Sequence, residues 1–369
     1  MATILSDAHA DAGQPAALSL IDCDIHQAVK SQPDLYPYLP RQYVEYIEDF
    51  GTMMPGVGYT NMPRKGTRGD LWVDGETVPG TDPALVAKQH LDAFGVNYGI
   101  LTGGPYAAAV HPDVDYGAAY CRAFNDWTRD VWCGCDSRFR ASVHVAPADP
   151  WQAAAEIDSR AADLRFVQVM IPAGARMPFG NRLYHPIYAA AERAGMPICV
   201  HFGAEGAGFS NAPTAAGFPS YYFEMRMARP QIAMAHVASL ISEGVFEKYP
   251  SLQFLFVEHD TFWVPGYMWH MDADWKAVRD YTPWVKRPPS EYLREHIRFG
   301  TQPMEEPPTR EDLFKLIEWM HGEEILVYAS DFPHWDWDEP TTVLPGLSER
   351  ARRRIFVENA RALYRRRGL

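Results

Sequence analysis

Several side chains that can bind metal ions or move protons stand where an apolar run gives way to a loop. The first run ends in Asp24-x-His26, a unit whose two donor groups can be aimed at one point. Later runs end in His201, in Glu258-His259-Asp260 and in Asp331. Carboxylate oxygens and imidazole nitrogens together suit Zn²⁺, Mn²⁺ or Fe²⁺, and imidazole disfavours Mg²⁺. The pattern predicts one mixed metal site, provided that the fold brings these positions together.

The first apolar run carries more charge than a buried strand normally tolerates. In a regular strand alternate side chains share a face, so Leu20, Asp22, Asp24 and His26 are expected on one side. Buried carboxylates must be paired or bound to a metal ion. We interpret Asp22 as a support that holds a ligand or a neighbouring donor in place.

Eight apolar, β-rich runs alternate with amphipathic stretches along the chain. Strands that alternate with helices favour a parallel sheet, and eight such units predict a single (β/α)₈ TIM barrel over residues 1–369. An open doubly wound sheet is the alternative, but no Gly-x-Gly-x-x-Gly turn follows an early strand. In a barrel the carboxyl ends of all strands meet at one rim, where the polar groups above would converge. The expected strands are 18–26, 96–102, 139–145, 166–171, 197–202, 252–258, 297–301 and 325–330, and the clearest helices are 151–164, 184–194, 310–320 and 349–364.

Residues 27–82 interrupt this alternation directly after the first strand. The segment is rich in Pro, Gly and Tyr. A connection of this length inside a compact domain is commonly functional. We interpret it as an insertion that forms a lid or a subunit-contact arm, with a purely decorative insertion as the alternative.

Composition limits the classes of partner. The chain has 369 residues and a formal net charge of −13, which argues against a nucleic-acid partner. Its first twenty residues lack the pattern of a signal peptide, and no apolar run is long enough to span a membrane. Five scattered cysteines favour a reduced, cytoplasmic protein, and Cys133-Gly-Cys135 has no second pair with which to bind zinc.

Several of these stretches together resemble the amidohydrolase superfamily, in the amidohydrolase-related branch typified by aminocarboxymuconate-semialdehyde decarboxylase. Each motif is weak alone, but their order and spacing are specific, and they span most of the chain. The matching stretches are Ile21–His26, Gly95–Thr102, Asn125–Trp127, Asp136–Phe139, Pro197–His201, Gly244–Leu252, Glu258-His259, Trp263–Pro265, Ser330–Trp335 and Asn359-Ala360.

The resemblance implies one divalent metal ion, for which we expect Zn²⁺ first and Mn²⁺ or Fe²⁺ as alternatives. Its ligands would be Asp24, His26, His201 and Asp331. His259 would be the catalytic imidazole, and Asp331 would also carry protons. Many relatives have His or Glu where this chain has Asp24, a departure that puts the metal preference in question. The resemblance also suggests a homodimer.

Two reactions are compatible with this ligand set. Our first hypothesis is a hydrolase that uses a metal-activated water on a small cyclic or aromatic amide, ester, lactone or carbon–carbon bond. There His259 would polarise the substrate carbonyl or stabilise an oxyanion. The alternative is a non-oxidative decarboxylase (carboxy-lyase) of an aromatic or unsaturated carboxylic acid, in which Asp331 protonates carbon. Aromatic-acid decarboxylases of the family often carry Glu three residues after this His, where this chain has Phe262. A catalytically inactive small-molecule-binding barrel is a further alternative, against which the intact ligand set argues.

Aromatic and charged residues near the strand ends are candidates for substrate contact. Phe262, Trp263, His334 and Trp335 follow the sixth and eighth strands, where they would line the mouth of the site. The alternative is ordinary packing between barrel and helices for the aromatic residues, and ordering of the closing loop for His334. We interpret Glu258 as a structural ion-pair partner, because it faces away from His259 if the strand is regular. Possible clamps for a substrate carboxylate are Arg176, Arg182 and Arg298.

Overall fold

Eight parallel strands form the centre of the molecule. The computed structural model describes residues 19–56 and 63–369. The strands stand in chain order, each hydrogen-bonded to the next, so all eight predicted strands are confirmed. They are β1 (Leu20–Ile25), β2 (Val96–Leu101), β3 (Phe139–His144), β4 (Phe166–Pro172), β5 (Ile198–His201), β6 (Phe254–Val257), β7 (Ile297–Gly300) and β8 (Leu326–Val327).

Backbone hydrogen bonds between the last and the first strand close the sheet on itself. The amide of Cys23 donates to the carbonyl of Tyr328 over 2.9 Å. Beyond the end of β8, the amide of Asp331 donates to the carbonyl of Asp24 over 3.0 Å. This seam leaves no open sheet edge, and the predicted (β/α)₈ barrel is confirmed.

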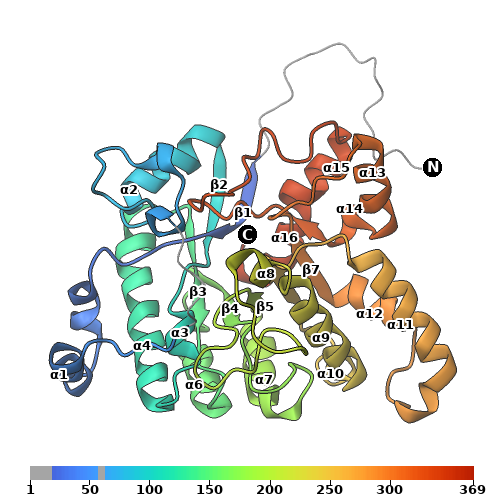
Figure 1. The fold of residues 1–369 in the computed structure, drawn as a ribbon, viewed down its shortest axis with the longest axis horizontal. Helices are drawn as coiled ribbons and strands as arrows, with labels where there is room; N and C mark the ends of the chain where they lie inside the picture. The colour runs from blue at the N-terminus through green and yellow to red at the C-terminus, as the bar shows by residue number, and fades with distance from the viewer. Residues whose placement is uncertain (1–18, 57–62) are drawn as a thin grey trace.

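Helices surround the strands (Figure 1). The four predicted helices are present as α6, α7, α13 and the run from α15 to α16. Among the described residues, no helix combines the length and the apolarity needed to cross a membrane. The helices are α1 (Arg41–Phe50), α2 (Pro83–Val86), α3 (Tyr106–Ala109), α4 (Val114–Trp127), α5 (Cys133–Cys135), α6 (Pro150–Arg160), α7 (His185–Ala194), α8 (Tyr222–Arg226), α9 (Arg229–Ser242), α10 (Val245–Lys248), α11 (Val264–Val278), α12 (Pro289–His296), α13 (Arg310–Trp319), α14 (Gly322–Ile325), α15 (Glu349–Arg353) and α16 (Asn359–Tyr364).

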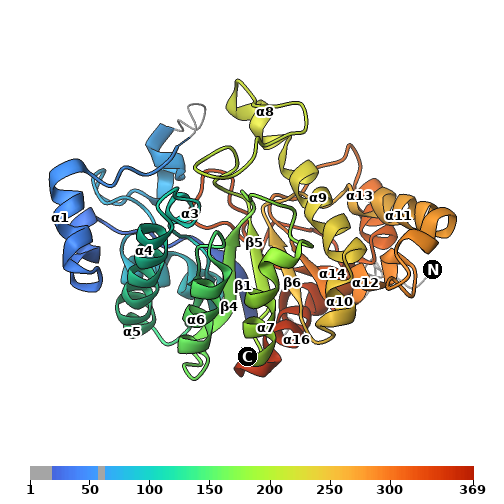
Figure 2. The same ribbon diagram turned by 90° about the horizontal axis from the view of Figure 1, so that it is seen from below.

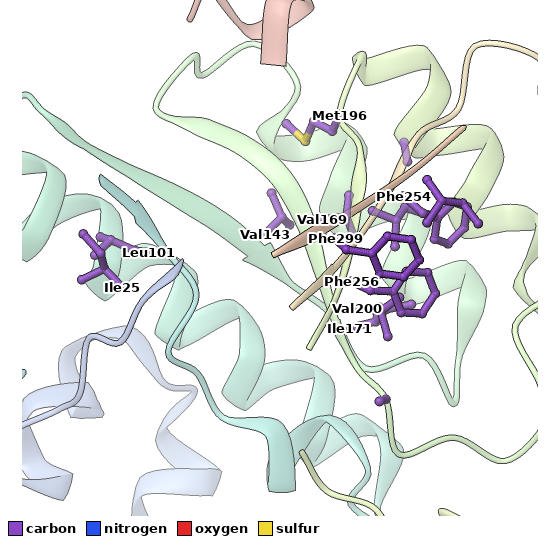
Figure 3. Close-up of a cluster of buried hydrophobic side chains, with 14 of the residues drawn as sticks. Ile25, Leu101, Val143, Val169, Ile171, Met196, Val200, Phe254, Phe256 and Phe299 are labelled. Atoms are coloured by element: carbon purple, nitrogen blue, oxygen red, sulfur yellow. The ribbon is translucent and has the colours of Figure 1, made fainter. Parts of the chain in front are cut away.

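The strands are apolar on both faces because both faces are covered. Outward-facing side chains pack beneath the helices, and Figure 3 shows part of this layer, including Phe254, Phe256 and Phe299. Inward-facing side chains such as Cys23 and Cys199 fill the barrel itself. Burial on two sides explains why the strands read as continuous apolar runs in the sequence.

The chain's last helix seals one end of the barrel, which leaves the other end for a site. Tyr364 of α16 belongs to the inner cluster, and its hydroxyl donates to Gln168 of β4 over 2.7 Å. Figure 2 shows the C-terminus at this end, with α8 and its flanking loops at the opposite end. The carboxyl ends of the strands face α8, as expected for a barrel enzyme.

The insertion after β1 contains helical turns and extended segments. A short 3₁₀ helix, η1 (Gln32–Tyr38), leads into α1. Residues 57–62 of the insertion lie outside the described part of the chain, as do residues 1–18.

The second half of the insertion lies against the loop that follows β8. The amide of Arg68 donates to the carbonyl of Pro333 over 3.1 Å, and the amide of Trp335 donates to the carbonyl of Gly66 over 2.9 Å. This contact places the insertion beside the carboxyl-end rim. Its interpretation as a lid or a subunit-contact arm stays a prediction.

A buried histidine of α9 joins this helix to the loop after β4. His236 Nδ1 accepts from the amide of Phe179 over 3.2 Å, and its Nε2 donates to the carbonyl of Ala173 over 3.0 Å. The amide can only donate, so Nδ1 must be unprotonated. The ring also stacks on Phe179 at 3.9 Å between centroids. Burial lowers the pKa of His236 from 6.5 to about 4, which keeps the ring neutral.

We expect this histidine to make stability depend on pH. Its folded-state pKa lies below the unfolded value, so between pH 4 and 6.5 the unfolded chain binds more protons. The contribution is complete above about pH 6.5 and decreases as the pH falls toward 4. At pH 5 the loss amounts to about 2 kcal/mol. Denaturant unfolding at pH 7 and pH 5 should therefore show a smaller acid destabilisation in His236→Gln than in the wild type. Equal pH dependence in the two proteins would contradict this assignment.

Candidate metal centre

Nitrogen and oxygen donors from four strand ends meet at one point on the rim. They form two overlapping groups whose donor atoms lie within 4.8 Å of one another. Both groups contain His26 and Glu258. The first adds Asp24 and His201, and the second adds Asp331 and His334. The structure thus brings together all four residues expected as ligands, and it adds two more.

The separations between these donors suit ligands of a single ion. Nε2 of His26 lies 3.2 Å from Nε2 of His201, 3.0 Å from Oδ1 of Asp331 and 3.3 Å from Oδ1 of Asp24. Oε1 of Glu258 lies 3.4 Å from Nε2 of each of the two histidines. Ligands that stand about 2.0–2.2 Å from one metal ion are roughly 2.8–3.6 Å apart in tetrahedral or octahedral geometry. The donor set therefore fits a divalent metal ion.

Buried charge provides a second test of this fit. Although burial opposes the charged form, the nearby carboxylate of Asp24 raises the pKa of His26 well above its usual value. Burial and the charge of Glu258 raise the pKa of Asp331. Carboxylates packed this closely need positive charge, which protons on the imidazoles supply here. A divalent cation can take the place of those protons.

A bulge in β1 gives Asp24 its position and corrects our prediction for Asp22. Asp22 pairs with Gly99 and Ile25 pairs with Leu101, so β1 has one extra residue between these pairs. A bulge turns later side chains relative to earlier ones. The expectation that Asp22 and Asp24 share a face was wrong, because alternation assumes a regular strand.

Asp22 supports the site from behind, as predicted. Its Oδ1 accepts from the amide of Asp24 over 3.1 Å and from the amide of Ser330 over 2.9 Å. Its Oδ2 pairs with Nε2 of His90 over 2.6 Å. One buried carboxylate thereby fixes the backbone on both sides of the β1–β8 seam.

Glu258 reaches the site because the backbone turns at the end of β6. Its φ is +58°, in the left-handed region that residues other than glycine rarely adopt. β6 ends at Val257, so the strand's alternation no longer applies at position 258. The predicted ion pair exists, since Oε2 of Glu258 lies 3.0 Å from Nη2 of Arg229. Our interpretation placed the side chain of Glu258 outside the site. That placement was wrong, because its Oε1 lies among the donors.

His259, the predicted catalytic imidazole, lies outside both donor groups. Its Nδ1 donates to the carbonyl of Arg229 over 3.2 Å, because a carbonyl can only accept. Nε2 is buried and has no hydrogen-bond partner among the described residues. Burial lowers the pKa of His259 to about 3, so the ring is neutral and Nε2 carries a lone pair. In this state Nε2 can accept a hydrogen bond, and the catalytic role that we expected for His259 stays a prediction.

The loop after β8 carries two of the donors. Asp331 has a φ of +64°, and Nδ1 of His334, three residues later, hydrogen-bonds to its Oδ1. His334 also lies 4.1 Å from His26 between ring centroids. His334 therefore contacts the donor cluster.

A cavity of about 480 Å³ lies beside the donors, on the side of β1, β2 and the insertion. Its wall includes Tyr106, whose ring stacks on His201 at 4.8 Å between centroids. None of its lining residues is charged. The full lining is Gln27, Ala28, Val29, Met54, Pro55, Gly56, Gly104, Pro105, Tyr106, Ala107, Ala108, Tyr120, Phe124, Ala204 and Ala207.

The aromatic residues expected at the mouth of the site divide into two groups. Trp335 is 44% exposed at the rim, and the guanidinium of Arg226 lies 5.0 Å from its ring. Phe262 and Trp263 pack against the core beneath the helices, where Trp263 contacts Phe299.

One of the arginines proposed as clamps lies at the wrong end of the barrel. Arg298 donates to the carbonyls of Arg294 and Ile297 at the barrel's amino end, so its proposed role was wrong. Arg176 and Arg182 are exposed. The arginine that does contact the cluster, Arg229, gave no signal in the sequence, because it meets Glu258 only through the fold.

Known proteins that are similar to the chain include two decarboxylases and an amidohydrolase. The gamma-resorcylate decarboxylase of a Polaromonas species is 22% identical over 295 residues, covering 74% of this chain and 85% of that protein. The 5-carboxyvanillate decarboxylase of Novosphingobium aromaticivorans, solved with manganese and 4-hydroxy-3-methoxy-5-nitrobenzoic acid, has a TM-score of 0.68 at 20% identity, covering 96% of this chain and 97% of that one. An amidohydrolase from Mycobacterium avium subsp. paratuberculosis has a TM-score of 0.68 at 22% identity, covering 95% and 100%. The structural likenesses show a shared fold.

The sequence motifs and the fold agree with a match to one family. A family model described as amidohydrolase matches residues 21–366, which is nearly the whole described chain. The match spans every strand that contributes a donor to the cluster. The chain therefore belongs to the amidohydrolase family.

Proposed function

We propose that this protein is a metal-dependent, non-oxidative decarboxylase of hydroxylated aromatic carboxylic acids. The observation that carries the proposal is the cluster of carboxylate and imidazole donors at the barrel rim, beside an uncharged cavity. Decarboxylases of aromatic acids among the similar proteins support this reaction over hydrolysis, our first hypothesis. The intact donor set argues against an inactive binding barrel.

Asp24, His26, His201 and Asp331 would hold the ion, with Glu258 as a further donor. When bound, the ion supplies positive charge that holds the substrate's oxygen atoms. The manganese of a relative supports Mn²⁺ rather than the Zn²⁺ expected from the sequence. Three carboxylates in the donor set also suit Mn²⁺, which accepts oxygen ligands readily.

The reaction replaces a carboxylate by a proton. Asp331 would deliver a proton to the ring carbon that bears the carboxylate. The carbon–carbon bond then breaks, its electron pair returns to the ring, and carbon dioxide leaves. His334, hydrogen-bonded to Oδ1 of Asp331, is placed to restore that proton. No oxidant or reductant is needed.

His259 would take part by accepting a hydrogen bond. Its free Nε2 lone pair matches a phenolic hydroxyl on the substrate. A hydrogen bond from that hydroxyl to Nε2 raises electron density on the phenolic oxygen and at the neighbouring ring carbon, which makes this carbon easier to protonate. The family's frequent Glu is absent at Phe262, but Glu258 supplies a carboxylate from the end of the same strand. The uncharged cavity wall beyond Tyr106 suits an aromatic ring.

Product analysis separates this reaction from hydrolysis. Manganese-loaded protein incubated with a panel of hydroxybenzoates in H₂¹⁸O should release carbon dioxide in equal amount to the phenol formed. The phenol should contain no solvent oxygen, because no water attacks the ring. A second panel, of hydroxybenzamides and aryl lactones, supplies substrates for a hydrolase. Solvent oxygen in the organic product, without carbon dioxide release, would establish hydrolysis instead.

Two alanine variants distinguish a loss of metal binding from a loss of catalysis. His201→Ala should lower metal affinity on the order of 10²-fold or more, because it removes a ligand. His259→Ala is the matched control: it should retain the metal while turnover falls on the order of 10²-fold or more. Metal content by elemental analysis and steady-state kinetics measure the two effects. Normal metal affinity in His201→Ala, or normal turnover in His259→Ala, would remove that residue from its role.

Glu258→Gln tests whether Glu258 contributes to metal binding. We expect metal affinity to decrease by about tenfold or more, because an amide binds a divalent cation more weakly than a carboxylate does. Gln keeps the size of the side chain and can still accept from Arg229. Competition with a metal-binding dye gives the affinity. An unchanged value would mean that Glu258 serves only as the partner of Arg229.

A further inference from the structure

Arg229 is a buried arginine whose hydrogen-bonding capacity is largely unused. It is the first residue of α9 and is 4% exposed. Nη2 lies 3.0 Å from Oε2 of Glu258. Nε and Nη1 are buried and have no partner among the residues that the structure describes. A buried N–H group without an acceptor destabilises the fold, so such a side chain needs a reason to persist.

The guanidinium is held in place from several sides. Its carbon lies 4.6 Å from the ring centre of Phe202, which supports one face of the plane. The backbone carbonyl of Arg229 accepts from Nδ1 of His259. The salt bridge with Glu258 fixes one edge. Fixed, charged donors of this kind bind an oxyanion with little loss of side-chain freedom.

The position of Arg229 links it to the donor cluster. Glu258 bridges the two, since Oε2 contacts Arg229 and Oε1 lies 3.4 Å from Nε2 of His26 and of His201. The carboxylate of Glu258 therefore lies between the guanidinium and the proposed ion. The ring of His259 lies beside the backbone of Arg229, to whose carbonyl its Nδ1 donates, and its Nε2 has no partner among the described residues.

Charge balance gives Arg229 a function that Glu258 alone does not explain. Asp24 and Glu258 together match the charge of one divalent ion, and Asp331 carries the proton that the proposed reaction uses. A substrate carboxylate would add a further negative charge to this buried site. The guanidinium of Arg229 supplies the positive charge that offsets it.

We propose that Arg229 binds the carboxylate of the substrate and selects acids over neutral phenols. This proposal rests on the proposed function for the kind of substrate. The carboxylate accepts from the free N–H groups of Arg229, and the neighbouring phenolic hydroxyl is directed to Nε2 of His259. The site thereby prefers an aromatic ring with a hydroxyl next to its carboxylate. The decarboxylated product lacks the group that Arg229 holds, which favours product release.

The test compares two ligands that differ only in the carboxylate. Calorimetry on manganese-loaded protein would give the Kd values of 2,6-dihydroxybenzoate and of resorcinol. We expect the wild type to prefer the acid by about tenfold or more, the range of a charge-assisted hydrogen bond. In Arg229→Gln the preference should fall to near one through weaker acid binding, while resorcinol binding stays within about twofold. Arg229→Lys should keep part of the preference, since the charge remains without the planar donors.

Arg298→Gln is the matched control, because it removes a partly buried arginine at the other end of the barrel. It should keep the wild-type preference. Equal weakening of both ligands in Arg229→Gln, or no preference for the acid in the wild type, would overturn the proposal. Metal analysis of each variant shows whether the substitution has also disturbed metal binding through Glu258. If the wild type prefers the acid but releases no carbon dioxide, the proposed reaction fails while the role of Arg229 in binding stands.

Discussion

Compensation of buried negative charge is the constraint on which this site depends. Asp24, Glu258 and Asp331 lie within one cluster at the rim, and each is almost fully shielded from water. Ionised carboxylates are stable in such surroundings only next to positive charge. The imidazoles, the Arg229 guanidinium and a divalent cation are the means of supplying it. The same requirement explains why these residues come from separate strand ends, because only the rim of a closed barrel brings such distant positions together.

Backbone geometry at the strand ends does the rest of the positioning. The bulge in β1 turns Asp24 away from the face of Asp22, so that Asp22 is free to hold the β1–β8 seam. Glu258, directly after β6, and Asp331, in the loop after β8, both have a left-handed backbone conformation. Such conformations cost about 1–3 kcal/mol each and persist where the surrounding structure enforces them. In this protein both of these residues place a carboxylate in the cluster, so the strained backbone and the chemistry coincide.

The sequence predicted what depends on local pattern. Eight apolar runs predicted the strands, because strands buried on both faces leave a strong signal, and the ends of these runs included Asp24, His26, His201 and Asp331. The family resemblance singled out these four as ligands. It misplaced Asp22 and Glu258 because alternation presumes a regular strand, whereas a bulge and a left-handed residue interrupt it. Arg229 was missed for a different reason. Its partner is distant in the chain, and nothing in the spacing marks that contact.

The contact between the insertion and the loop after β8 constrains how a small molecule can reach the ion. Gly66 and Arg68 are hydrogen-bonded through their backbones to Trp335 and Pro333, which flank His334. Lifting this part of the insertion would pull on the loop that carries two donors, and would disturb the ion at the moment of entry. A small molecule that enters elsewhere on the rim would leave these hydrogen bonds intact. In that case the insertion would serve as a wall of the site rather than as a moving lid, and variation in its length or composition would alter which rings fit.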